Sequence, residues 1–206
     1  VVPVGSSALL DGVKVADTGI DASGNMYLES YLINQTSISR PDLRFYIASG
    51  AEFSNEGSLE VISGMYVGSA SPPGGNFRNV NELIVNSPVT ACTFTSDAHF
   101  INEGTLRVQN GTLALYESAG EYGGYIRVDA AGVIDGTALM SFYGDSIRVD
   151  GTVMLPQLSM DGTINPQWAG GAGTIYNLQV NALNGLELLG STTITQNLNL
   201  SNGVVT

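Results

Sequence analysis

Residue types that support many common chemistries are scarce in this chain of 206 residues. It has one lysine, Lys14, one histidine, His99, and one cysteine, Cys92. One cysteine cannot form an internal disulfide, and a single His and Cys cannot supply a cluster of soft metal ligands. No catalytic triad built on His99 has an obvious partner, and nothing beside Cys92 in the sequence would activate its thiol. We therefore expect no catalytic residue and no cofactor, and the sequence points to no metal ligand. A Ca²⁺ site built from scattered carboxylates stays open.

Charged residues are also few, at 13% of the chain, and their balance is acidic. Seven basic and 19 acidic residues give a formal net charge of −12. Such a chain repels the phosphates of nucleic acids and the anionic surface of a membrane. No apolar run is long enough to span a bilayer. We predict that the chain has no nucleic-acid partner and does not insert into a membrane.

Glycine is abundant, with 26 residues, and hydrophobic residues make up 43% of the chain. Asn, Ser and Thr separate short apolar runs, which is typical of short strands joined by tight turns. Lysine, one of the residues that favour helices, occurs only once. This composition predicts an all-β fold with a packed core.

An internal repeat is the strongest signal in the sequence. Residues 53–61, 77–85 and 100–108 share the pattern Phe-x-Asn-x-x-x-Leu-x-Val, at steps of 24 and 23 residues (77 − 53 and 100 − 77). One coil of a parallel β-helix holds about three short strands and their turns, which takes roughly 20–25 residues. We predict a right-handed parallel β-helix, or β-solenoid, with coils of about 20–24 residues and some longer loops.

Stacking these coils at about 4.8 Å would place like residues on like. We predict interior columns of aromatic and aliphatic side chains, and a ladder of amides that hydrogen-bond along the axis. The predicted columns are Phe53, Phe77 and Phe100; Leu59, Leu83 and Leu106; and Asn55, Asn79 and Asn102.

The rest of the chain follows the theme less regularly. Residues 1–50 contain alternating strands without a clean repeat, and they form either atypical coils of the same solenoid or part of a neighbouring element. Residues 51–206 are predicted to be β-helix repeats that continue beyond Thr206. Ile126 and Ile147 begin similar strands 21 residues apart (147 − 126), but the pattern at 133–139 competes with that alignment. The register between residues 113 and 175 therefore stays open.

A polar patch follows from the strands at 126–128 and 147–149. Arg127 and Arg148 should face outward on adjacent coils, because the residues beside them face inward. Asp129 and Asp150 could pair with them if the chain turns directly after each strand. These aspartates are either turn residues that offset the arginine charge or acids of a polysaccharide-cleaving site. We favour the turn interpretation.

The sequence of residues 174–206, TIYNLQVNALNGLELLGSTTITQNLNLSNGVVT, resembles the β-helical repeats of large exported surface proteins of the Bacteroidetes. The segments at 53–61 and 100–108 are similar to repeats of filamentous adhesins and autotransporter passenger domains. The resemblance implies an extracellular or cell-surface location, export by the type IX secretion system, and a role as a surface fibre or adhesin. It carries over no catalytic residue.

These observations favour a structural or adhesive segment of a large cell-surface or secreted protein, and not an enzyme. Its expected partners are neighbouring repeats of the same longer chain, and surface glycans or other cell-surface proteins contacted through loops such as 71–76 and 165–173. The alternative is a carbohydrate-active β-helix, either a polysaccharide lyase or hydrolase or a depolymerase like those of phage tail fibres.

Overall fold

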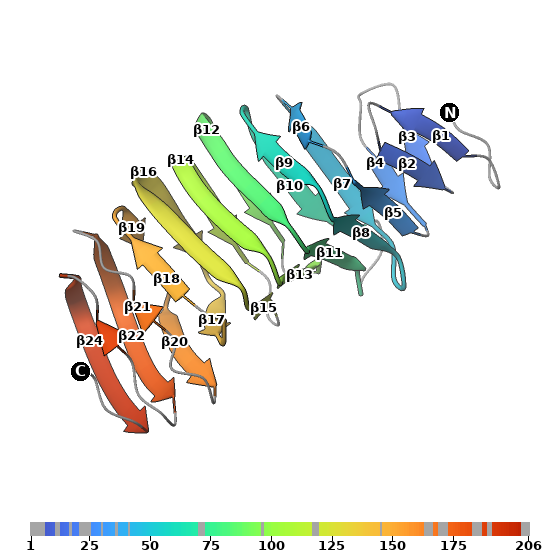
Figure 1. Cartoon of the computed structure of the whole chain (residues 1–206). Helices are drawn as coiled ribbons and strands as arrows, with labels where there is room; N and C mark the ends of the chain where they lie inside the picture. Colours follow the sequence, from blue (N-terminus) through green and yellow to red (C-terminus); the bar gives the residue numbers. More distant parts are fainter. Residues whose placement is uncertain are drawn as a thin grey trace.

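The chain folds into a parallel β-solenoid of about seven turns, which confirms the predicted parallel β-helix (Figure 1). All regular elements in the described part of the chain are strands, and no helix there is long and apolar enough to cross a membrane. The computed structural model describes residues 7–10, 13–16, 18–20, 26–29, 31–35, 37–40, 42–69, 73–95, 97–116, 120–144, 146–162, 167–168, 173–182, 187–188 and 191–202.

Each coil contributes strands to three parallel columns, which we call A, B and C. Column A contains β5 (Tyr31–Asn34), β8 (Glu52–Asn55), β11 (Asn76–Asn79), β13 (His99–Asn102), β15 (Glu121–Tyr122), β17 (Leu139–Phe142) and β20 (Gln157–Gly162). Column B contains β6 (Ser37–Arg40), β9 (Ser58–Val61), β18 (Ser146–Val149), β21 (Gln167–Trp168) and β23 (Glu187–Leu188). Column C contains β4 (Met26–Leu28), β7 (Leu43–Ile47), β10 (Met65–Gly68) and β19 (Thr152–Val153).

Five longer strands serve two columns. β12 (Glu82–Phe94), β14 (Thr105–Leu115) and β16 (Tyr125–Gly136) pass from column B to column C. β22 (Thr174–Ala182) and β24 (Thr193–Asn202) pass from column C to column A. These strands join the three columns into one continuous sheet, so the coil closes around a single core.

The N-terminal strands pair differently from the rest. β1 (Ser7–Leu10), β2 (Val13–Ala16) and β3 (Thr18–Ile20) make antiparallel pairs at the N-terminal end of the stack (Figure 1). From Met26 onward the chain already occupies the parallel columns. Leu32 pairs with Phe53 and Asn34 with Asn55, so the repeat begins one coil earlier than the sequence pattern indicated. A leucine at the Phe position hid this coil.

The predicted interior columns are confirmed. Leu83 pairs with both Leu59 and Leu106, and all three are at most 2% exposed. Phe77 likewise pairs with Phe53 and Phe100, with ring centroids 4.9 and 5.9 Å away. Stacking at the spacing of the coils thus gives each large side chain an equivalent neighbour on both sides.

The predicted asparagine ladder is also confirmed and is one residue longer than expected. The side-chain Nδ2 atoms of Asn34, Asn55 and Asn79 each donate to the Oδ1 atom of the next asparagine, at 2.7, 2.8 and 2.7 Å, ending at Asn102. All four are at most 1% exposed. Tyr122 takes the equivalent place on the following coil, and the ladder ends there. A buried amide is tolerated because its donors and acceptors are bonded along the axis.

The structure resolves the register that the sequence left open. Ile126 pairs with Ile147, as the first alignment proposed. The competing alignment at 133–139 is wrong, because Asp135 lies in column C opposite Ala114 and not in the asparagine ladder. The proposed loops at 71–76 and 165–173 lie partly outside the described residues.

The interior columns reach the surface at β24. Leu198 and Leu200 are each 52% exposed, whereas Leu178 and Val180, their partners on the previous coil, are 4% and 0% exposed. The last described strand therefore presents an apolar row beside its unpaired edge, which is the stacking surface that every earlier coil covers.

Replacing Leu83 with alanine should lower the free energy of unfolding by about 2–5 kcal/mol, because it opens a cavity between two leucines. Urea unfolding followed by circular dichroism measures this change. Ile84→Ala is the matched control, since Ile84 is the adjacent outward-facing residue of β12 and only partly buried. Equal losses in the two variants would contradict the stacked interior.

Replacing Asn79 with leucine should also destabilise the fold, although leucine is similar in size. The change removes the donor to Asn102 Oδ1 and to the carbonyl of Thr105, and each buried group left unsatisfied costs about 1–3 kcal/mol. Thermal unfolding measures the effect. A variant as stable as the wild type would show that the ladder contributes nothing to stability.

Candidate functional site

The predicted arginine patch lies on the outer face of column B. Arg107, Arg127 and Arg148 pair directly across β14, β16 and β18, so three arginines stand on consecutive coils where the sequence analysis named two. Their side chains are 34%, 37% and 42% exposed. The segment at 106–108 carries the same apolar-Arg-Val order as the two later strands, and this signal could have identified Arg107.

Two aspartates pair with the three arginines of this row. Asp129 accepts hydrogen bonds from Arg107 Nε at 2.8 Å and from Arg127 Nε at 2.5 Å, so it bridges two coils. Asp150 accepts from Arg148 Nε at 2.7 Å. The sequence analysis expected these aspartates to reach the arginines only if the chain turned directly after each strand. That condition was wrong, because residues i and i+2 of one strand share a face. Asp129 lies within β16 at a local register irregularity, and a bend is present only at Asp150.

The surroundings of Asp129 keep its carboxylate charged. Burial acts to raise the pKa of Asp129, but the hydrogen bonds from Arg127 and Arg107 outweigh it and hold the pKa below its ordinary value. A general acid in glycoside cleavage needs the opposite, a carboxyl group that stays protonated. The patch therefore has the chemistry of a neutralised ion-pair network.

Cys92 and His99 are the two chemically distinctive residues that the sequence singled out, and both lie in strands. Cys92 is fully buried, and burial raises the pKa of its thiol to about 12. His99 lies in β13, and its Nε2 atom is buried without a hydrogen-bond partner. Within the described residues, no group of three or more His, Cys, Asp or Glu side chains is placed to hold a metal ion.

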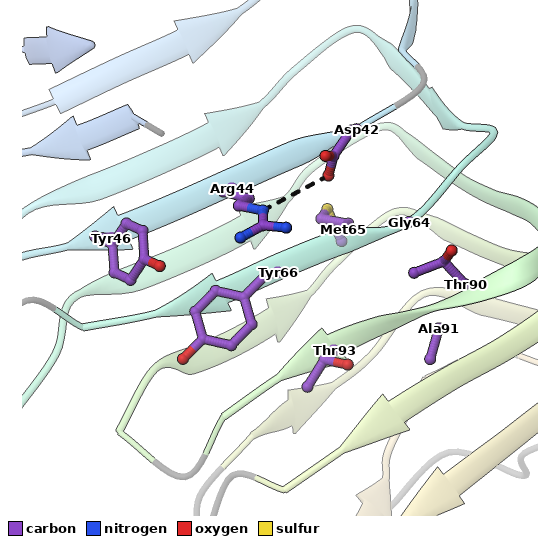
Figure 2. A pocket seen from close by; sticks show the side chains of 9 residues that line it. All are labelled: Asp42, Arg44, Tyr46, Gly64, Met65, Tyr66, Thr90, Ala91 and Thr93. Carbon is purple, nitrogen blue, oxygen red and sulfur yellow. Dashed lines mark ion pairs between the residues drawn. The ribbon is translucent and has the colours of Figure 1, made fainter. Parts of the chain in front are cut away.

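A hollow on the outer face of column C was not predicted from the sequence. This column C groove has a volume of about 440 Å³ and crosses three consecutive coils (Figure 2). Its walls carry an ion pair, two phenol rings and two hydroxyls. The residues that supply them are Asp42, Arg44, Tyr46, Tyr66, Thr90 and Thr93.

Two local features shape the column C groove. β12 carries four residues, 88–91, where the neighbouring β14 carries only Thr112, so three extra residues bulge outward. Val89 in this bulge is 91% exposed. Gly64, with φ of +109°, lies beneath the bulge, and a Cβ atom there would come within 2.8 Å of Thr90 Cγ2. Gly64, Thr90 and Ala91 therefore pack together and form one wall of the hollow.

A tyrosine ladder forms one side of the groove. Tyr27 and Tyr46 stack with centroids 5.0 Å apart, and Tyr66 follows at 5.6 Å from Tyr46. Tyr66 also lies over Gly68, where a Cβ atom would come within 2.8 Å of the tyrosine Cε1. Its ring is thus supported from behind while the side chain is 37% exposed.

Comparisons with known proteins add no assignment: no family model matches this chain, and neither the curated proteins nor the solved structures contain a match.

Replacing Asp129 with asparagine should leave two neighbouring arginines without a charged partner. We expect the free energy of unfolding at neutral pH to fall by up to about 1 kcal/mol. Because the folded-state pKa of Asp129 is lowered, its contribution is present above the unfolded-state pKa and is lost as the pH falls through the folded-state value. Unfolding measured from about pH 7 to 2 should therefore show the wild type and the variant converging in acid.

Asp42→Asn is the control for this measurement, since the Asp42–Arg44 pair is more exposed and its Oδ1 and Nε atoms are 3.9 Å apart. It should change the free energy of unfolding less than Asp129→Asn does. A difference between Asp129→Asn and the wild type that does not vary with pH would contradict the assigned role of the carboxylate.

Proposed function

We propose that this chain is a structural and adhesive β-helix segment of a large extracellular or cell-surface protein, and that it is not an enzyme. The resemblance of residues 174–206 to exported Bacteroidetes surface proteins supports this location and export by the type IX system. The observation that carries the proposal is a set of hydrogen bonds between polar side chains on the outer faces of adjacent coils. These bonds from coil to coil stiffen the stack.

These external bonds recur along the solenoid. Gln35 donates to Glu56, Ser58 donates to Glu82, and Asn197 donates to Asn177, each on the adjacent coil. Arg78 makes two hydrogen bonds to Glu103, which raise the pKa of the guanidinium. Such contacts suit a rod that must hold its shape.

The exposed apolar row on β24 supports a further part of the proposal. Leu198 and Leu200 continue columns that are otherwise buried. We propose that neighbouring repeats of the same longer chain cover this row, as each coil covers the one before it. Surface glycans or other cell-surface proteins are the partners proposed for the lateral faces.

A carbohydrate-cleaving β-helix remains the rival interpretation, because the patch brings acids from adjacent coils onto one face. Arg148 and Asp150 lie one coil beyond Arg127 and Asp129. Cleavage by two carboxylates requires one of them to be a proton donor, and the lowered pKa of Asp129 argues against that role. The passive role is therefore the better supported one.

A reducing-sugar assay on mixed neutral and acidic polysaccharides tests the proposal. We expect no release of reducing ends from the wild type or from Asp150→Asn. Reproducible release that Asp150→Asn abolishes would overturn the passive role and place a catalytic acid in the patch. A denatured sample of the wild-type chain provides the background rate.

A further inference from the structure

We infer that the column C groove binds a neutral saccharide chain through the ring of Tyr66 and the Asp42–Arg44 pair. The inference deepens the proposed adhesive role and rests on it, because it names the ligand class and the surface that adhesion would use. Four properties of the groove point to this ligand: a supported aromatic ring, a pair of exposed polar groups, balanced charge and an open shape.

The ring of Tyr66 supplies an apolar surface for the C–H face of a sugar. Tyr66 is 37% exposed at the edge of the groove, and Tyr46 lies beside it (Figure 2). The ring of Tyr66 also packs over Gly68. An aromatic ring offers a flat apolar face, and its hydroxyl offers a polar end. Since the ring is already held in place, stacking a ligand on it requires little further ordering.

The Asp42–Arg44 pair supplies both kinds of hydrogen-bonding group that sugar hydroxyls need. Asp42 Oδ1 and Arg44 Nε are 3.9 Å apart, which is too long for a hydrogen bond. Their side chains are 63% and 55% exposed, so both can reach a ligand. A carboxylate only accepts and a guanidinium only donates, whereas each sugar hydroxyl does both. Neighbouring hydroxyls of one sugar therefore match the two groups.

The charge of the groove favours a neutral ligand. Asp42 and Arg44 cancel locally, and the chain as a whole carries a net charge of −12. A polyuronate, a sulfated glycan or a nucleic acid would meet repulsion at long range and no unbalanced cation in the groove. A neutral polyol avoids this cost and can still satisfy both charged groups with hydroxyls.

The shape of the groove fits a short stretch of a longer chain. A volume of about 440 Å³ lies within the range of about 300–1,000 Å³ for small-molecule sites. Three coils extend about 10 Å along the axis, and the groove is open to solvent. Asp42 is the one carboxylate among its described lining residues. Two carboxylates are needed for the usual cleavage of glycosides, so the ligand should be bound and left intact.

Isothermal titration calorimetry with defined tetrasaccharides tests the inference. Cellotetraose, maltotetraose and mannotetraose are the neutral probes, and tetragalacturonate is the acidic probe. We expect at least one neutral probe to bind and the acidic probe not to bind. Tyr66→Ala should weaken binding by about tenfold or more, whereas Tyr66→Phe, which keeps the ring, should change it by less than about threefold.

Tyr116→Ala is the matched control, since Tyr116 is 44% exposed and lies outside the groove. It should bind like the wild type. Thr93→Trp gives a second test, and unlike Tyr66→Ala it leaves the tyrosine ladder intact. Thr93 faces outward into the groove, so tryptophan should fill the space and abolish binding while circular dichroism shows an unchanged fold.

The outcomes separate this inference from the proposed function. A neutral probe that binds, depends on Tyr66 and is recovered intact supports both. Failure of all neutral probes, preference for tetragalacturonate, or binding that survives both Tyr66→Ala and Thr93→Trp overturns the saccharide groove and leaves the structural role standing. Recovery of cleaved probe overturns the passive role, while loss of binding in Tyr66→Ala would still support the groove as the saccharide site.

Discussion

Axial stacking of equivalent residues is the constraint on which the rest of this structure depends. Parallel strands repeat at about 4.8 Å, so a side chain that fits one coil meets its own kind on the next. Leucine packs on leucine along column B, and Asn34, Asn55, Asn79 and Asn102 pass hydrogen bonds along column A. A buried amide is stable here because the neighbouring coils supply its partners.

The same stacking places like charges next to each other on the outer face of column B. An arginine at an outward position recurs on the next coil, and Arg107, Arg127 and Arg148 form a row of like charges. Asp129 and Asp150 pair with these arginines from the strand itself, two residues further along on the same face. The row of arginines in this patch thus follows from the repeat, which places equivalent residues side by side.

The column C groove arises where the repeat is broken. Three extra residues in β12 bulge outward next to Gly64, so one coil departs from the outline of its neighbours. Regular coils have flat faces because each repeats the last, and recognition of a ligand requires a concave surface. Irregular coils are therefore the places where a solenoid can acquire a binding site while the rest of the rod stays rigid.

The sequence by itself determined the period, the inward columns and the asparagine ladder, because side chains that stack on their own kind recur at equal steps along the chain. It did not reveal the coil at residues 31–40, where leucine replaces phenylalanine, or the register around Asp135, where two alignments fitted equally well. Only the tertiary structure decided which side chains meet across coils on the outer face. The ladder tyrosines recur at steps of 19 and 20 residues (46 − 27 and 66 − 46). The groove also uses Thr90 and Ala91 from the bulge of β12, and these residues belong to no repeat that a sequence pattern could show.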